Sequence, residues 1–284
     1  MNKKVVVGIG ELLYDVFPSG KRPGGAPANF AYHASKHGHE GYVVSAIGDD
    51  DFGEEITKFL SVKSVNLILE KTKFPTGIVE VKLDYRGVPS YNILPDVAWD
   101  NMSYNHDMAM LATRTDAVCF GSLAQRNVVS RQSIMQFVDV VAKNKGLVVF
   151  DVNLRQNFYG PTIIHDSVLK SSILKLSEEE LPEICSCLNL SADNENEVCK
   201  EILNQYGLKH VILTCGAKCS YVFDINNCSY IETPKVNVID TVGAGDAFTA
   251  SFVSAILNGV TMSDAHKQAV DYSAYICTCC GAMP

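Results

Sequence analysis

The 284-residue sequence has no long hydrophobic run and no excess of positive charge. Its first apolar stretch, Val5–Ile9, is too short for a signal-peptide core or a membrane span, so the cytoplasm is the expected location. The formal net charge of −8 argues against a nucleic-acid partner or an anionic membrane surface. It does not exclude an anionic nucleotide, because local backbone N–H groups can bind phosphate regardless of net charge.

Two familiar site motifs are also missing. The ten cysteines lack the two-residue gap of zinc-binding pairs, and no His lies near them at ligand spacing. We therefore expect buried or half-buried free thiols rather than metal ligands or disulfides. The pattern G-x-x-x-x-G-K-[ST] is absent, which excludes the P-loop kinases.

Apolar strands alternate with amphipathic helices along most of the chain. The expected strands cover residues 4–10, 43–47, 118–121, 147–151, 173–176 and 211–214. The expected helices cover residues 28–37, 52–60, 129–144, 194–206 and 263–276, with a further one beginning near residue 245. Repeated strand–helix units predict a parallel sheet covered on both faces.

One region interrupts this alternation. Residues 77–84 alternate with period two, Tyr85-Arg86-Gly87 gives a turn, and residues 89–94 form a second extended run. With the extended piece at residues 12–17, they predict a small β-sheet standing off the main one. Its elements, roughly 12–23 and 75–98, would be inserted in a single α/β domain over residues 1–284. A lid over the carboxyl ends of the strands is the functional interpretation, and an edge hairpin without function is the alternative.

The most informative segment runs from Asp240 to Phe248, with the sequence DTVGAGDAF. It places a glycine-rich turn before an apolar helix, where unpaired N–H groups and the positive end of the helix dipole can bind an anion. Asp246 at this junction would be a base beside a bound phosphoryl group. An ordinary loop with a capping Asp is the alternative.

Three further clusters of polar residues follow strands or turns. In Gly24-Gly25-Ala26-Pro27-Ala28-Asn29, bare backbone and an amide, with Asp15 upstream, suit vicinal hydroxyls; a plain turn is the alternative. Asp151, Asn153 and Arg155 alternate, so an extended chain would present them on one side; an Asp151–Arg155 pair is the alternative.

The third cluster combines Glu178–Glu180 with the segment from Thr214 to Lys218. Carboxylates that follow a strand can hold hydrated Mg²⁺, which needs few protein ligands. Charge at a helix start is the alternative for at least two of the three glutamates. Thr214 and Gly216, at a strand end, would border a nucleotide.

Taken together, these motifs resemble the PfkB-type sugar kinases (the ribokinase family) over essentially the whole chain. The early glycine-rich turn is similar to the first family signature, and DTVGAGD to the second, which is highly specific. Three segments are most similar to the fructokinase branch: Phe120-Gly121-Ser122-Leu123-Ala124, Asp151-x-Asn153-x-Arg155 and Lys175-Leu176-Ser177-Glu178-Glu179-Glu180. The resemblance implies a ribokinase-like three-layer α/β sandwich with a mostly parallel central sheet and a small β-sheet lid.

The resemblance also implies roles for individual residues. Asp246 would be the base, and Gly243, Ala244 and Gly245 would form the anion hole. Asp15, Gly25 and Asn29 would hold the sugar, with Arg155 near the phosphate or sugar. Thr214 and Gly216 would line the ATP site, and Glu180 would hold Mg²⁺ through water. Asp240, Val242 and Gly281 would bind a monovalent cation, usually K⁺, and a homodimer would form through the lid.

The chain departs from the family pattern at three places. Ser177 stands where the magnesium-linked motif usually begins with Asn, which weakens the case for Glu180. Cys219 stands where Gly is common and would crowd the nucleotide loop. The sequence stops at Pro284, soon after Gly281, so the cation loop would lack a closing residue.

We therefore expect an ATP-dependent carbohydrate kinase, with fructokinase as the leading activity. A 2-keto-3-deoxygluconate kinase is the first alternative, and its acidic sugar would need a further cation, for which Lys21, Arg22, Arg86 and Arg126 are candidates. Ribokinase or nucleoside kinase comes next. A sugar- or nucleotide-binding sensor without catalysis is disfavoured because Asp246 is present.

Overall fold

The computed structural model describes residues 3–17, 20–83, 89–191 and 194–284. Within these residues the main sheet has nine strands in the order β13-β12-β11-β10-β9-β8-β1-β4-β5. They are β1 (Val5–Ile9), β4 (Glu40–Gly48), β5 (Asn66–Thr72), β8 (Ala117–Phe120), β9 (Leu147–Asp151), β10 (Ile173–Ser177), β11 (His210–Thr214), β12 (Cys219–Phe223) and β13 (Cys228–Glu232). The strands from β11 to β5 in this order pair in parallel.

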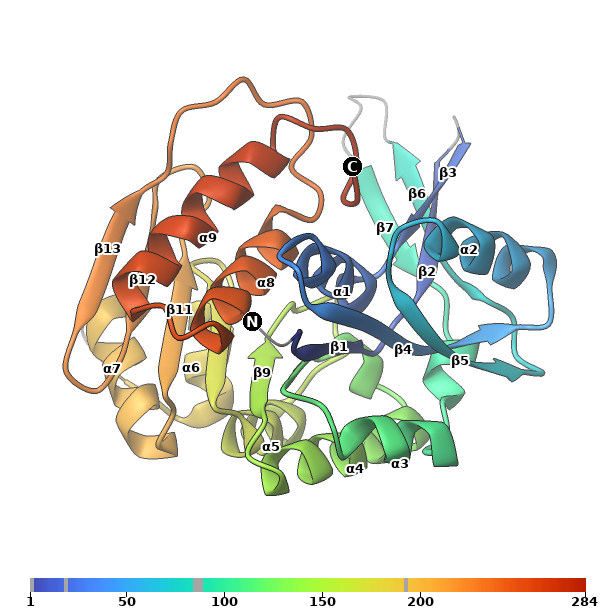
Figure 1. Ribbon diagram of the computed structural model, residues 1–284, viewed down its shortest axis with the longest axis horizontal. Coiled ribbons are helices and arrows are strands. Elements are labelled where there is room, and N and C mark those ends of the chain that lie inside the picture. The colour runs from blue at the N-terminus through green and yellow to red at the C-terminus, as the bar shows by residue number, and fades with distance from the viewer. Residues whose placement is uncertain (1–2, 18–19, 84–88, 192–193) are drawn as a thin grey trace.

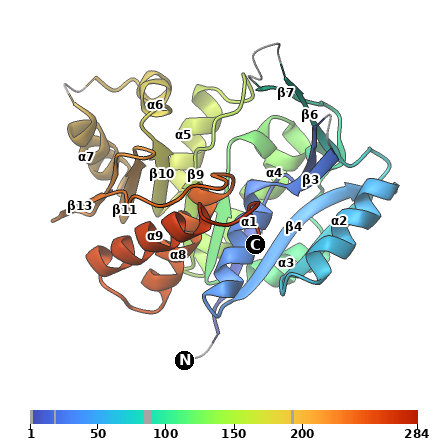
Figure 2. The same cartoon turned by 90° about the horizontal axis from the view of Figure 1, so that it is seen from above.

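Helices connect the parallel strands and cover both faces of the sheet. They are α1 (Ala26–Lys36), α2 (Asp51–Ser61), α3 (His106–Ala112), α4 (Val128–Lys143), α5 (Pro161–Lys170), α6 (Leu181–Leu188), α7 (Glu195–Tyr206), α8 (Ala244–Leu257) and α9 (Met262–Ile276). Several begin at a side-chain cap, such as Asp50, whose carboxylate accepts the N–H of Gly53 at 2.8 Å. Figure 2 shows α5, α6 and α7 on one side of the central strands and α8 and α9 on the other.

The period-two alternation of the strands divides the core into two layers. Val5 and Val7 of β1 pack in one apolar cluster with residues of α3 to α7. Val6 faces the other side and packs with Phe252 of α8 and Phe30 of α1. Because each central strand is apolar on both faces, it contributes to both layers, as expected for a buried parallel strand. The sandwich has three layers, as the resemblance implied.

A four-stranded sheet stands off the main one, in the order β3-β2-β6-β7. Its strands are β2 (Leu13–Phe17), β3 (Gly20–Gly24), β6 (Gly77–Leu83) and β7 (Pro89–Ile93). Strand β2 pairs in parallel with β6, and the outer strands pair antiparallel with these two. This small sheet lies at the upper right of Figure 1. The predicted small sheet is confirmed, and the turn predicted at residues 85–87 lies outside the described residues.

The main sheet differs from the prediction at one edge, where β12 and β13 run antiparallel to their neighbours. Residues 215–218 alone connect β11 to β12, and a parallel pairing needs a crossover of a dozen or more residues. Strand β5 and helices α3 and α5 were not predicted either. Each is short or only partly buried, so its apolar pattern is weak.

In the part of the chain that the structure describes, no helix is both long and apolar enough to span a membrane. All ten cysteines are free, as predicted. The expectation that all would be buried or half-buried is wrong for two of them, because Cys228 and Cys280 are exposed.

Candidate active site

The starts of helices α1 and α8 meet at the carboxyl ends of the parallel strands. The Nδ2 of Asn29 donates to the Oδ2 of Asp246 at 2.7 Å, across 217 residues of sequence. A cavity of about 10 Å³, at the lower limit for holding one water molecule, lies against this contact. Its walls come from α1, β8, β9 and the start of α8: Ala26, Pro27, Phe30, Cys119, Phe120, Gly121, Asp151, Asn153 and Asp246.

Asp246 lies in the first turn of α8 without capping it. The residue in the N-cap position is Gly243, and no side chain caps the helix. The Asp246 carboxylate instead accepts from Asn29, on another helix, and is half-buried. The capping interpretation therefore fails, and the carboxylate is placed at the mouth of the helix.

The backbone turn before α8 presents free N–H groups. Gly243 has φ +78°, a conformation that glycine adopts without strain. A Cβ at this position would also lie 2.6 Å from the Cβ of Ala282. The N–H of Ala244 donates to the carbonyl of Thr241 at 3.2 Å, so this predicted anion donor is already bonded. Among the described residues, the N–H groups of Gly243, Gly245 and Asp246 have no such acceptor, which leaves them available to an anion.

A buried ion pair lies beside this turn. The Nζ of Lys175 in β10 donates to the Oδ1 of Asp151 at the end of β9, at 3.0 Å. The Oγ1 of Thr249 donates to the other oxygen of Asp151 at 3.1 Å. A Cβ at Gly245 would be 3.3 Å from the Lys175 ammonium, so the turn lies in close contact with this cation. Burial lowers the pKa of Lys175, but the negative charges of Asp151 and Glu180 outweigh this effect. The pKa is raised overall, so the ammonium stays charged.

Two carboxyl groups in the site have perturbed pKa values. Burial raises the pKa of Asp246 to about 6, and the negative charge of Asp151 adds to this effect. The Asn29 hydrogen bond and the cations Lys175 and Arg155 oppose the rise. Burial also raises the pKa of Glu11, in the loop after β1, to about 7. Such pairs of shifted carboxyl groups are typical of catalytic sites.

The pKa of Asp246 predicts an acid limit for activity. A base must be deprotonated to accept a proton, so kcat/KM should fall as the pH drops through about 6, approaching tenfold per pH unit. The measurement is kcat/KM between pH 5 and 8 at constant ionic strength. The circular dichroism spectrum at each pH serves as the control for folding. A rate that stays constant down to pH 5 would remove Asp246 from the role of base.

Asp15 and Gly25 lie beside the same opening. The register pairs Asp15 of β2 with Arg22 of β3, and a Cβ at Gly24 would be 3.1 Å from the Oδ2 of Asp15. Gly25 has φ +126° and lies against the carbonyl of Glu11, so a side chain has neither the conformation nor the space there. The structure thus brings Asp15, Gly25 and Asn29 together at one turn.

The segment after β9 differs from the prediction. The strand ends at Asp151, and the backbone of Asn153 has φ +45°, so the chain is not extended. Asp151, Asn153 and Arg155 consequently do not form one row of side chains. Asp151 pairs with Lys175 rather than with Arg155, which is exposed and donates to the carbonyl of Leu154 at 2.8 Å. Arg155 remains near the site, since its charge lowers the pKa of Glu11, Asp15 and Asp246.

Glu180 closes the turn that follows β10. One carboxylate oxygen accepts the N–H of Ser177 and the other accepts the N–H of Leu154, both at 2.8 Å. The Ser177 hydroxyl in turn accepts the N–H of Glu180 at 3.3 Å. The two residues therefore bond each other's backbone, which is the reciprocal arrangement of a capping box. Ser177 therefore performs a structural function at the position where Asn is usual. Glu178 is paired with Lys218 at 3.0 Å.

The residues present fit a magnesium ion held mainly by phosphate and water. Among the described residues no cluster of three His, Cys, Asp or Glu side chains could hold a metal directly. Both oxygens of Glu180 already accept a backbone N–H but have lone pairs left for bound water. Mg²⁺ keeps several waters and needs only one or two carboxylates. Glu180 therefore fits a water-mediated contact.

Two further predicted sites lie at the edges of the opening. Thr214 ends β11, and the carbonyl of Gly216 accepts the Thr233 hydroxyl at 3.0 Å. Cys219, predicted to crowd this loop, begins β12, and its carbonyl accepts the N–H of Cys215 at 2.9 Å. These bonds belong to the hairpin that joins β11 to β12.

The predicted cation residues are brought together by one carboxylate. Asp240 accepts the N–H of Val242 at 3.1 Å and that of Gly281 at 3.2 Å. The guanidinium of Arg22 lies 3.4 Å from the same carboxylate. The loop before α8 and the C-terminal loop are therefore adjacent, as a shared cation site requires.

Lys175 and Glu11 are the site residues that the sequence reasoning did not assign. Each carried a usable signal. Lys175 is the one charged residue in the buried apolar strand Ile173–Ser177, and an isolated buried charge requires a partner. Glu11 follows the apolar run of β1 directly, at the edge of the sheet where ligands bind.

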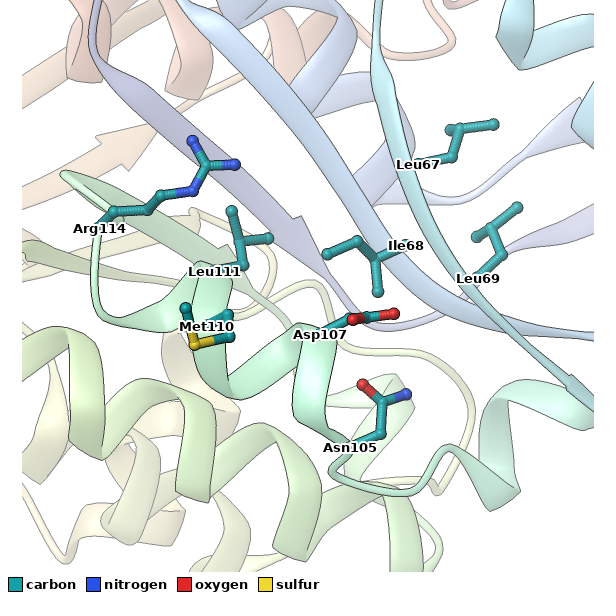
Figure 3. Close-up of a pocket in the computed structure, with 8 residues that line it drawn as sticks. All are labelled: Leu67, Ile68, Leu69, Asn105, Asp107, Met110, Leu111 and Arg114. Atoms are coloured by element: carbon teal, nitrogen blue, oxygen red, sulfur yellow. The ribbon is translucent and has the colours of Figure 1, made fainter.

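A larger hollow lies elsewhere on the protein. It measures about 370 Å³ and is lined by residues of β5, α3 and the segment before and after α3. Figure 3 shows Ile68 of β5 and Leu111 of α3 on facing sides of it. At one end Arg114 donates to the hydroxyl of Tyr42 at 2.6 Å. None of the residues lining it comes from α1, α8 or β9, so it is separate from the carboxylate site.

Comparison with known proteins gives consistent matches over most of the chain. The model of the pfkB family of carbohydrate kinases matches residues 10–284. A putative sugar kinase of Pyrococcus horikoshii, PH1459, is 32% identical over 274 residues, covering 89% of this chain and 83% of the relative. Its crystal structure in complex with ATP superposes with a TM-score of 0.83 at 28% identity, covering 98% of this chain and 94% of that one.

Relatives with more specific names are more distant. A probable fructokinase-2 of Arabidopsis thaliana is 28% identical over 280 residues, covering 91% of this chain and 82% of the relative. An aminoimidazole riboside kinase of Salmonella typhimurium is 26% identical over 265 residues, covering 89% and 80%. The names agree on phosphorylation of a sugar-like molecule and differ in the substrate.

Proposed function

Because the chain belongs to the pfkB family of carbohydrate kinases, we propose that it transfers phosphate from ATP to a hydroxyl of fructose. The observation that carries the choice of a neutral sugar is the state of the cations near the site. Lys21 is paired with Glu55, Arg22 with Asp240 and Arg126 with Asp100. A sugar acid would need a free cation for its carboxylate. Arg86, the fourth candidate, lies outside the described residues, and Arg155, which is exposed and donates to the carbonyl of Leu154, is assigned to the transferred phosphate or a sugar hydroxyl.

The site residues support a direct transfer. Asp246 accepts the proton of the sugar hydroxyl as the hydroxyl oxygen bonds to the γ-phosphorus. The bond between that phosphorus and the β,γ-bridging oxygen breaks, and ADP leaves. The free N–H groups at the start of α8 stabilise the charge that develops on the phosphoryl oxygens. Asn29 orients the carboxylate of Asp246 through its 2.7 Å bond.

The nucleotide and its metal would occupy the neighbouring part of the site. We assign Thr214 and Gly216 to the ATP site because they lie at the end of β11, on the same edge of the sheet as Asp151. Glu180 would hold Mg²⁺ through water. When bound, Mg²⁺ would supply the positive charge that neutralises the phosphates.

A substrate screen tests the proposed activity. ADP release is measured with purified protein, ATP and Mg²⁺ against fructose, ribose, 2-keto-3-deoxygluconate and adenosine. The expected result is the highest kcat/KM with fructose. The same screen without K⁺ tests the predicted cation site at Asp240, Val242 and Gly281. A higher kcat/KM with 2-keto-3-deoxygluconate would overturn the choice of a neutral sugar.

Replacing Asp15 by Ala is expected to weaken sugar binding far more than ATP binding. Asp15 lies over the turn at Gly24 and Gly25, and a site built to hydrogen-bond hydroxyls loses strongly when a polar partner is removed. The measurement is KM for sugar and for ATP. Asp107→Ala, in the separate hollow of Figure 3, is the control that should change neither. A higher KM for ATP with an unchanged KM for sugar would show that the sugar site is elsewhere.

Several finer expectations stay predictions. These are the lid function of the small sheet, a homodimer formed through it, the K⁺ site and the cytoplasm as the location. The single-domain organisation with insertions at 12–23 and 75–98 belongs with them. Sedimentation of the purified protein tests the dimer directly, and deletion of the small sheet would show whether it is required for association.

A further inference from the structure

Arg126 forms a buried fork with Asp100, away from the residues that would touch substrate. Arg126 follows the turn η2 (Leu123–Gln125) after β8, and Asp100 lies in the turn η1 (Ala98–Asn101). The Nε and Nη2 of Arg126 donate to the two oxygens of Asp100, each at 2.7 Å. The side chains are 7% and 2% exposed. Two parallel charge-assisted bonds in a buried setting fix the guanidinium in one orientation.

The same guanidinium contacts the base of the small sheet. Its Nη2 also donates to the carbonyl of Leu94 at 2.6 Å, and Leu94 directly follows β7. The guanidinium carbon lies 4.2 Å from the centre of the Trp99 ring. That ring in turn supports the start of β6, because a Cβ at Gly77 would be 2.7 Å from Trp99 Cδ1. The start of β6 and the end of β7 therefore both contact the cluster formed by Arg126, Asp100 and Trp99.

A third contact reaches the segment that presents Arg155. The ring of Phe158 is 4.5 Å from the Arg126 guanidinium carbon, within the range of a cation–π interaction. Phe158 donates its N–H to the carbonyl of Arg155 at 3.1 Å, so the two residues close one turn. Arg126 thus lies between the small sheet and the turn of Arg155.

The cluster is poorly explained by stability alone. A buried ion pair contributes little compared with apolar residues of the same volume. Two donors here, the Nη1 of Arg126 and the Nε1 of Trp99, are buried without a partner among the described residues. Leaving buried donors unpaired costs free energy. The charged fork adds directional bonds, and the guanidinium that they orient contacts three segments of the chain.

We propose that Arg126 is a positioning residue of the sugar site, which fixes the small sheet and the turn of Arg155 relative to each other. The proposal rests on the proposed function, in which Asp15 of the small sheet holds the sugar and Arg155 lies near the phosphate or sugar. It replaces the expectation that Arg126 would bind a substrate carboxylate, because the fork to Asp100 already occupies it. Any movement of the small sheet would then also move the turn that carries Arg155.

Two variants separate positioning from folding. Arg126→Lys keeps the charge and loses the fork, whereas the double variant Asp100→Asn with Arg126→Met removes both charges and keeps the volume. The matched control is Arg131→Met, which breaks an Arg–Asp166 contact of the same 2.7 Å length in a more exposed setting. Thermal unfolding, KM for sugar and ATP, and hydrogen exchange of β6, β7 and residues 152–160 are measured for each.

The expected result is a rise in KM for sugar on the order of 10- to 100-fold in both variants, with KM for ATP changed less than about twofold. Without any ligand, β6, β7 and residues 152–160 should all exchange faster than in the parent and in the Arg131→Met control. A lower melting temperature with unchanged KM and unchanged local exchange would mean a structural role only and would overturn the proposal. Faster exchange in just one of the two segments would also overturn it.

The exchange measurement needs no substrate, so it distinguishes the two hypotheses. If no tested sugar is phosphorylated, the proposed function fails, while the exchange data still decide whether Arg126 joins the two segments. If fructose is phosphorylated by the parent and the variants behave like the control, the function stands and the positioning role fails.

Discussion

Replacing Asp246 by Asn is expected to lower kcat by about 10²–10⁴-fold, the usual contribution of a positioned base. The amide keeps the shape of the side chain and can still contact Asn29, but it cannot accept the proton of the sugar hydroxyl. The fold and ATP binding should be retained. The measurement is kcat at saturating sugar and ATP, with ATP affinity determined by calorimetry.

The chain offers a closely matched control for this change. Asp264 is the third residue of α9, as Asp246 is of α8, but it accepts the N-cap hydroxyl of Thr261 at 2.8 Å and lies on the surface. Asp264→Asn should leave kcat unchanged. If kcat of Asp246→Asn equals kcat of Asp264→Asn, Asp246 is not the catalytic base.

Replacing Lys175 by Met is expected to destabilise the protein by about 3–5 kcal/mol, because it leaves the buried carboxylate of Asp151 without its ion-pair partner. The double variant Lys175→Met with Asp151→Asn should recover most of this loss, since it removes both charges. Urea unfolding followed by circular dichroism gives the free energies of unfolding. The surface pair of Lys218 with Glu178, also 3.0 Å long, provides the control.

The two ion pairs differ in how far their side chains are exposed to solvent. Lys218 is 74% exposed and Lys175 11%, so Lys218→Met should cost less than about 1 kcal/mol. Equal costs for Lys175→Met and Lys218→Met would contradict the prediction. So would a double variant as unstable as Lys175→Met alone, because the cost would then come from lost packing rather than from an unpaired charge.

The sequence predicted those parts of the site whose residues lie close together in one short segment of the chain. The turn before α8 is recognisable because glycines, a carboxylate and an apolar helix follow one another. The same holds for the turn at Gly24 and Gly25 and for the small sheet, whose period-two pattern is local. The start of the helix and the glycine turn before it follow from residues that are neighbours in sequence.

The parts that escaped prediction depend on residues far apart in sequence. Lys175 finds Asp151 only because β9 and β10 are adjacent in the sheet. Without that pairing, Arg155 was the nearest plausible partner for Asp151. The row expected for Asp151, Asn153 and Arg155 failed because the strand ends at its first member, and the Glu180 bond to Leu154 then holds the turn. The end of the strand at residue 151 was predicted correctly, but the turn that follows it depends on this bond to a residue distant in sequence.

The contact between Asn29 and Asp246 also has a consequence for biosynthesis. The two residues are 217 positions apart, so the base and its partner meet only after most of the chain has left the ribosome. Until then the apolar cluster that contains Phe30 of α1 lacks the residues that α8 supplies, such as Phe252. A nascent chain of this length therefore carries an uncovered hydrophobic surface that favours chaperone binding or aggregation. Activity should accordingly return as one of the last signals during refolding from denaturant, since such long-range contacts form slowly.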